Sequence, residues 1–277
     1  MFIPVSIKYP LEWLLVFVLL LTAKLIEWYK PPFIRAVQLT DPTINFPFIA
    51  KQQYSDLKLF SAAVFLPFFC ICVYNSTWLA LNGWRNAKQF YVWHMSLLSF
   101  GFAVALNGIS TEFLKTLIGK PRPDFVARCG PDRTPKGALT ETAIIVDPLR
   151  VCTRPYGDAV FLDGFKSTPS GHSSFALCGL VWLTLYAYGQ SRVLHGSSKA
   201  SQLLLTLPLW FAVQICISRT QDYRHHFKDI LLGGLLGGLV GAGTYYWFFP
   251  SVTSEKCNEP KTSGPPVDWC KEPQNIV

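Results

Sequence analysis

Six long apolar runs, separated by polar stretches, dominate this 277-residue chain. A helix needs about 20 mostly apolar residues to cross a bilayer, so the runs predict an all-α integral membrane bundle. Trp and Tyr gather near the ends of the runs, as they do at membrane interfaces. The six expected membrane helices cover residues 11–29, 59–81, 91–114, 172–190, 202–218 and 230–249.

The first run leaves an alternative open. Its stretch without charged residues, 13–23, has the length of the apolar region of a signal peptide. However, the apolar pattern continues through 25–29 and no clear A-x-A cleavage site follows. We therefore favour a retained helix, with Lys24 and Glu27 extending from its end towards water.

The charge pattern restricts the class of partner. Only 15% of the residues are charged, against about a quarter in a soluble domain. The net charge is +8, but the basic residues form no run typical of nucleic-acid binding. We expect no nucleic-acid partner, and a basic rim that meets anionic head groups or phosphate.

The remaining segments are expected to lie outside the membrane. The connector 30–57 and the loop 115–168 are polar, and we expect no soluble domain. Residues 251–277 have the composition of a disordered tail. The expected organisation is one six-helix domain over 1–250, with its core at 90–250, followed by that tail. The sequence indicates no oligomeric state.

Cysteines, glycines and one sequon give further expectations. Cys129 and Cys152 share the long loop; they could be bridged in an oxidising compartment or remain free thiols. Asn75 begins a glycosylation sequon inside the second run, so we expect it to be unmodified. Glycine recurs every fourth residue at 233, 237 and 241, which predicts close packing against another helix.

Three polar clusters lie at the ends of the third to sixth apolar runs. "KTLIGKPRP" follows the third run, "PSGH" opens the fourth, and "SRTQDYRHHFKD" joins the fifth to the sixth. The alternation of crossings places all three on one membrane face. Ionisable residues there are costly and usually functional, so we expect an active site at that face.

The residue types in these clusters suit phosphate. Lys115, Arg122 and Arg219 supply cations, and arginine forks onto two phosphate oxygens. Ser170 and Gly171 start a helix, where free N–H groups favour an anion. Lysine and arginine would then stabilise the developing charge, so we expect no metal and no cofactor.

The histidines suit phosphoryl transfer through a phosphohistidine. His225 and Asp229 are four residues apart and would share a helix face if the sixth helix began early. Asp229 could then hold one imidazole nitrogen of His225 and leave the other free to attack. His172 could protonate the leaving oxygen.

Other polar residues have simpler interpretations. We expect His226 to be a rim neighbour, because only His225 has an aspartate four residues on. Three loop carboxylates fit no metal-ligand pattern and are expected to be solvated: Asp124, Asp158 and Asp163.

The three clusters together resemble the motifs of the type 2 phosphatidic acid phosphatase family: K-x6-RP, PSGH and SR-x5-H-x3-D. Here they run from Lys115 to Arg122-Pro123, over 169–172, and from Ser218 through His225 to Asp229. The flanking "RPDFVARC" and "LDGFKSTPSGHSS" are similar to the diacylglycerol pyrophosphate phosphatase branch.

The resemblance implies a six-helix, metal-independent lipid phosphatase whose site faces away from the cytosol. It implies His225 as the nucleophile, Asp229 as its partner and His172 as the general acid/base. The phosphate would be held by Lys115, Arg122, Ser170, Gly171 and Arg219. The excess of Lys and Arg on the motif side would, by the positive-inside rule, favour the opposite orientation.

The expected substrates are lipid phosphates in the bilayer: diacylglycerol pyrophosphate, phosphatidate and lysophosphatidate. A preference for the pyrophosphate would follow if extra cations near the clamp bound a second phosphate. The candidates are Lys120, Arg128, Arg224 and Lys228. The alternatives are a catalytically silent lipid-phosphate binder, which would lack a nucleophile or acid, and a transporter, which would carry charges in mid-helix.

Overall fold

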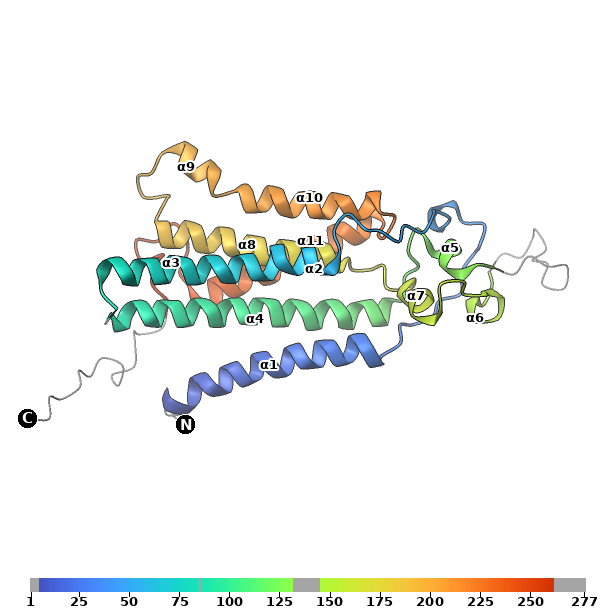
Figure 1. Cartoon of the computed structure of the whole chain (residues 1–277), viewed down its shortest axis with the longest axis horizontal. Coiled ribbons are helices and arrows are strands. Elements are labelled where there is room, and N and C mark those ends of the chain that lie inside the picture. Colours follow the sequence, from blue (N-terminus) through green and yellow to red (C-terminus); the bar gives the residue numbers. More distant parts are fainter. Residues whose placement is uncertain (1–4, 85, 132–144, 262–277) are drawn as a thin grey trace, which may run out of the picture.

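A computed structural model describes residues 5–84, 86–131 and 145–261. Within these residues the structure is helical, apart from two isolated β-bridges. Long helices lie side by side along the longest axis, and three short helices between residues 125 and 163 gather at one end (Figure 1). The all-α prediction is therefore confirmed.

The long helices correspond to the predicted apolar runs. They are α1 (Val5–Tyr29), α2 (Asp56–Phe60) continued by the π-helix η2 (Ser61–Phe65) and α3 (Leu66–Asn82), α4 (Ala87–Ile118), α8 (Gly171–Ser191), α9 (Lys199–Leu204) followed by α10 (Leu207–Gln221), and α11 (Phe227–Phe248).

Five described helical stretches are long and apolar enough to cross a membrane, and they make this a multi-pass membrane protein: Lys8–Tyr29, Asp56–Asn82, Ala87–Ile118, Lys199–Gln221 and Phe227–Phe248. The fourth predicted span, α8, is long enough but is not among them. It contacts α4, α10 and α11, and most of its side chains are buried. A helix that faces protein on most sides tolerates more polar residues than one that faces lipid.

Two predicted helix boundaries change near the polar clusters. The helix expected at 91–114 extends at both ends, because Asn86 caps its start and Gly119 adopts a left-handed φ of 58° at its end. Lys115 therefore lies in the last turn of α4. The helix expected at 202–218 is interrupted after Leu204, and α10 continues to Gln221.

The glycines of α11 bring it against α8, as predicted. A Cβ atom added at Gly233, Gly237 or Gly241 would overlap a backbone carbonyl group of the 170–178 segment. This close approach fixes the start of α11 beside the start of α8. At the other end of the bundle, Asn75 is fully buried and donates to the Tyr186 hydroxyl group (2.8 Å), in agreement with an unmodified sequon.

The polar segments outside the bundle form a small structure with its own apolar core. We call it the cap: residues 30–55, 119–131 and 145–169. It contains one turn of 3-10 helix, η1 (Pro42–Ile44), and three short α-helices, α5 (Phe125–Cys129), α6 (Pro148–Val151) and α7 (Asp158–Asp163). Val37 and Ile44 of the connector pack with Phe125, Phe161 and Phe165 of the loop. The two segments expected to lie outside the membrane therefore fold together.

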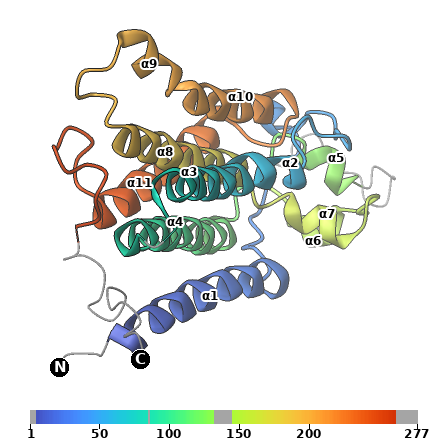
Figure 2. The same cartoon turned by 60° about the vertical axis from the view of Figure 1, so that its left-hand side comes forward.

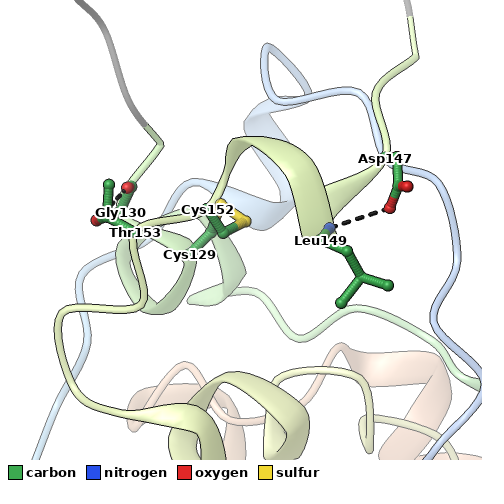
Figure 3. The surroundings of a disulfide bond; sticks show 6 residues. All are labelled: Cys129, Gly130, Asp147, Leu149, Cys152 and Thr153. Atoms are coloured by element: carbon green, nitrogen blue, oxygen red, sulfur yellow. Dashed lines mark hydrogen bonds between the residues drawn. A yellow bond between two sulfur atoms is a disulfide. The ribbon is translucent and has the colours of Figure 1, made fainter. Parts of the chain in front are cut away.

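A disulfide bond between Cys129 and Cys152 closes the loop of the cap (Figure 3). Thr153 donates its hydroxyl group to the Gly130 carbonyl oxygen beside it (2.7 Å). The bridged alternative for these cysteines is therefore the one found.

The expected tail packs on the bundle over its described part. Cys257 is buried, and Glu259 forms an ion pair with Lys88 of α4 (2.8 Å). The Lys261 amide donates to the Phe248 carbonyl oxygen (2.9 Å). Residues 251–261 thus do not fit the predicted disordered tail, and 262–277 lie outside the described residues.

Candidate active site

The three polar clusters meet at the cap end of the bundle, as the sequence predicts. The Ser170 amide donates to the Asp229 carbonyl oxygen (3.0 Å), which joins the second cluster to the third. Arg122 of the first cluster donates through Nη1 to the Arg224 carbonyl oxygen (3.3 Å). The ends of α4 and α10 and the starts of α8 and α11 therefore surround one site.

Lys115 lies against the start of α8. Ser170 caps this helix by accepting from the Ser173 amide (3.4 Å). A Cβ atom on Gly171 would lie 2.7 Å from the Lys115 ammonium nitrogen, so only glycine lets the ammonium approach this closely. The ammonium group is held by Glu112, one turn earlier on α4 (2.9 Å). A cation and a helix N-terminus thus converge, an arrangement that favours an anion.

Arg122 is fixed by three hydrogen bonds to the protein. Its Nε donates to the Asp163 carbonyl oxygen (2.8 Å) and its Nη2 to the Asp163 carboxylate (2.8 Å). The third bond is the one to the Arg224 carbonyl oxygen. A guanidinium group has five N–H donors, so about two remain for an anion. The pre-ordered fork loses little entropy when it binds phosphate.

Asp163 is more than the solvated loop residue that the sequence predicts: 41% of its side chain is exposed, but its carboxylate pairs with two arginines. Its carboxylate also accepts from Arg128 (2.9 Å), which Asp124 grips with both carboxylate oxygens (2.8 and 2.9 Å). Burial raises the pKa of Asp163, but the charges of Arg122 and Arg128 outweigh burial and hold the pKa well below its usual range. Asp163 and fully buried Asp124 therefore hold Arg122 and Arg128 in one ion-pair network.

Replacing Asp163 with asparagine is expected to lower kcat/KM by roughly tenfold to a hundredfold, because displaced binding groups cost about this much. Vanadate affinity should fall in parallel, and Asp163→Glu should recover part of both. The matched control is Asp158→Asn, which removes a carboxylate of the same helix that pairs with Arg154 (2.5 Å) and is 72% exposed. Equal losses in both variants, or unchanged vanadate affinity in Asp163→Asn, would contradict a positioning role.

Arg219 lies at the end of α10. We call Lys115, Arg122, Arg219 and the start of α8 the clamp. Arg219 is fully buried and donates through Nη2 to Asp222 (2.7 Å). Its Nη1 donates to the side-chain oxygen of Gln52 in the cap (2.8 Å). The cap therefore contacts the clamp directly, which the sequence motifs do not indicate.

His225 has a single defined tautomer. Its Nδ1 lies 2.7 Å from the Ser167 carbonyl oxygen, which only accepts, so Nδ1 carries the proton and Nε2 the lone pair. Burial lowers the pKa of His225 well below its usual value, and the charges of Arg122 and Lys115 lower it further. The imidazole is therefore neutral at pH 7, as a nitrogen nucleophile must be.

The predicted hydrogen bond between His225 and Asp229 is wrong. α11 begins at Phe227, so His225 precedes the helix and does not share a face with Asp229. The Asp229 carboxylate accepts instead from the hydroxyl groups of Ser167 (2.6 Å) and Thr168 and from Lys120 (2.7 Å). Asp229 acts on His225 indirectly, because it fixes the residue whose carbonyl group orients the imidazole.

His226 lies beside His225 in the lining of one open depression, and it also has a structural role. It is the N-cap of α11, and its amide and Nδ1 both lie 3.1 Å from the Asp229 carboxylate. Its Nε2 lies 3.1 Å from the Thr43 carbonyl oxygen of the cap. One side of the His226 ring thus contacts Asp229, and the other side contacts the cap.

His172 lies in the first turn of α8. Its Nε2 lies 3.0 Å from the Tyr54 carbonyl oxygen, so Nε2 donates and Nδ1 is free to exchange a proton. The Asp56 carboxylate lies 3.8 Å from the same nitrogen. The two histidines thus come from different helices and are oriented by different backbone carbonyl groups. Among the described residues no three His, Cys, Asp or Glu side chains are grouped as metal ligands.

Fold and site together describe a multi-pass helical membrane protein with largely buried cationic side chains beside a neutral histidine. The model of the PAP2 superfamily matches residues 96–252, more than half of the chain, so the chain belongs to this superfamily.

Several relatives match most of the chain. It is 36% identical over 223 residues to "Probable diacylglycerol pyrophosphate phosphatase 1" of Schizosaccharomyces pombe, covering 80% of this chain and 74% of that one. It is 32% identical over 251 residues to "Diacylglycerol pyrophosphate phosphatase 1" of Saccharomyces cerevisiae (90% and 82%). It is 30% identical over 242 residues to "Probable lipid phosphate phosphatase 4" of Arabidopsis thaliana (86% and 72%). No solved structure gives a significant match.

Proposed function

We propose that this protein is an integral membrane lipid phosphatase that releases phosphate from diacylglycerol pyrophosphate, phosphatidate and lysophosphatidate. The similarity to phosphatases with such names supports the substrate class. The observation that carries the chemistry is the tautomer of His225: its Nε2 is free of protons, beside cations that suit a phosphoryl group.

In the proposed reaction, Lys115, Arg122 and Arg219 bind the phosphoryl oxygens with the amides of Ser170 and Gly171. The Nε2 of His225 attacks phosphorus while the bond to the leaving oxygen breaks. That oxygen takes the Nδ1 proton of His172, which enters this step as the imidazolium and leaves it as the neutral imidazole. Water then gives its proton to His172 and attacks the phosphohistidine, which releases phosphate and restores His225. Asp229 keeps the Ser167 carbonyl in place throughout.

We propose α8 as the sixth span of a domain over 1–250, because it lies parallel to the apolar helices in the centre of the bundle (Figure 1). The active site would face the lumen or another extracytoplasmic compartment of an endomembrane. The disulfide bond in the cap supports this orientation, since disulfides persist in oxidising compartments.

Phosphate release from a panel of lipid phosphates tests this function. In mixed micelles with EDTA, the three lipids should be hydrolysed at the rates seen with magnesium, because arginine and lysine supply the charge stabilisation. Vanadate should inhibit, since it fits the same clamp. Loss of activity in EDTA that magnesium restores would contradict the proposed mechanism, and faster hydrolysis of glucose 6-phosphate than of any lipid would contradict the substrate class. A silent binder would release phosphate from none.

A further inference from the structure

A cavity of about 290 Å³ opens on the side of the site that faces α1. It lies between α1, α2, α4 and α8, and Figure 2 shows α1 set apart from the other long helices. Its polar lining includes Lys115, Gly171 and His172, and its apolar lining includes Leu20 and Phe175. His225 lines a different, open depression, together with Phe46 of the cap and Tyr223 of the turn between α10 and α11.

This division matches the two sides of an in-line displacement. The nucleophile and the leaving oxygen lie on opposite sides of the phosphorus atom. His225, the proposed nucleophile, and His172, the proposed acid, line different hollows. The cavity next to His172 is therefore where the leaving part of the substrate lies.

A second cation lines this cavity. Lys24 of α1 shares the lining with Lys115 of α4. Lys24 is held by Glu27 (2.7 Å), with half of its side chain exposed. It was expected to do no more than reach for water at the membrane edge. Its place in the lining lets its ammonium group meet an anion in the cavity.

The extra cations expected to bind a second phosphate do not face this side. Lys120 is bound to Asp229, and Arg128 is saturated by Asp124 and Asp163. Arg224 donates to the Ile49 carbonyl oxygen of the cap (3.1 Å), and Lys228 is exposed. A second phosphate on the leaving-group side would therefore meet Lys24 rather than these four.

We propose that Lys24 binds the leaving phosphate of a pyrophosphate lipid and so sets a preference for that substrate over a monophosphate lipid. When His225 attacks the terminal phosphorus, the bridging oxygen departs with the inner phosphate, which becomes the phosphate of phosphatidate. Lys24 exchanges Glu27 for this phosphate and stabilises its charge. A monophosphate lipid places an uncharged glycerol oxygen there. The inference rests on the proposed lipid phosphatase function.

The carboxylates of the cavity permit this exchange. Glu112 is paired with Lys115 (2.9 Å), and Glu27 also lies near Lys166, whose ammonium group donates to the Glu27 carbonyl oxygen (3.2 Å). The side chains of Glu27 and Asp56 are 41% and 81% exposed, so water screens their charges. Glu27 can turn to solvent when phosphate takes its place.

The test compares kcat/KM for diacylglycerol pyrophosphate and phosphatidate in mixed micelles with the full chain. Lys24→Gln should lower the value for the pyrophosphate about tenfold, as loss of a hydrogen bond to a charged group does. The value for phosphatidate should change less than about twofold, because an exposed ion pair contributes little. Lys24→Arg should retain the preference. The matched control, Glu27→Gln, breaks the same ion pair but keeps the cation, and should retain it too.

Each outcome decides the inference. A tenfold fall in both substrates with Lys24→Gln, or an equal fall with Glu27→Gln, would mean that the ion pair only holds α1 in place. An unchanged ratio in a Lys24→Gln protein that hydrolyses both lipids would overturn the inference and leave the phosphatase function intact. If Lys24→Gln does not fold, the wild-type protein still decides: equal kcat/KM values for the two lipids would overturn the inference. A wild-type protein that hydrolyses neither lipid would overturn the proposed function itself.

Discussion

His225→Ala is expected to lower phosphate release by about 10³-fold or more, since removing a nucleophile eliminates the covalent route. The clamp would still bind phosphate, because Lys115, Arg122 and Arg219 are held by contacts that do not involve the imidazole. The measurement is kcat for each lipid, together with vanadate affinity. Acid-labile label from a radioactive terminal phosphate should be trapped on wild-type protein and be absent from His225→Ala.

His226→Ala is the matched control for this variant. His226 carries the same ring one position on, but it is fastened to Asp229 and to the cap. Its removal should loosen Asp229 and cost a small part of the activity while leaving the labelled intermediate. Label on His226, or full activity in His225→Ala, would show that the nucleophile has been misassigned.

The arrangement of the clusters could be predicted from sequence because it depends only on the alternation of membrane crossings. Each apolar run reverses the direction of the chain, so the face on which Lys115, His172 and His225 fall is fixed by counting. The close approach of α8 and α11 was predictable for a similar reason, since a four-residue glycine period marks one helix face. Neither inference needs the details of side-chain packing.

The partner of His225 could not be predicted in this way. The group that orients it is the carbonyl oxygen of Ser167, and every residue has such an oxygen, so the sequence contains no sign of it. The spacing from His225 to Asp229 suggested a direct bond, but the helix begins two residues after His225. A helical spacing places two side chains on one face only when both belong to the helix.

The cap was missed because its core is assembled from segments about a hundred residues apart. Val37 and Phe125 both lie in segments whose average composition is polar, so neither segment shows an apolar period. Asp163 was likewise interpreted as solvated, since its arginine partners are distant in sequence. The spacing of Asp124 and Arg128, four residues apart, was the one available signal of this network.

His172→Ala is expected to distinguish substrates by their leaving groups. With phosphatidate the departing oxygen belongs to an alcohol. Its pKa is similar to that of water, about 15.7, so the oxygen needs a proton as the bond breaks. With the pyrophosphate lipid the departing oxygen belongs to a phosphate, whose second pKa is about 6, and it leaves without one. We expect kcat/KM to fall about 10² to 10⁴-fold for phosphatidate and roughly tenfold or less for the pyrophosphate.

The choice of kcat/KM makes this comparison selective. It reports the steps up to departure of the lipid, whereas the attack of water on the phosphohistidine is common to both substrates and affects kcat. His172→Ala should raise the ratio of kcat/KM for the pyrophosphate to kcat/KM for phosphatidate. Lys24→Gln should lower this ratio, because it removes charge stabilisation that only the pyrophosphate uses. His172→Gln, which keeps a polar side chain of similar reach but supplies no proton, should behave like His172→Ala. Equal losses for the two lipids would mean that His172 only shapes the start of α8 and gives no proton to the leaving oxygen.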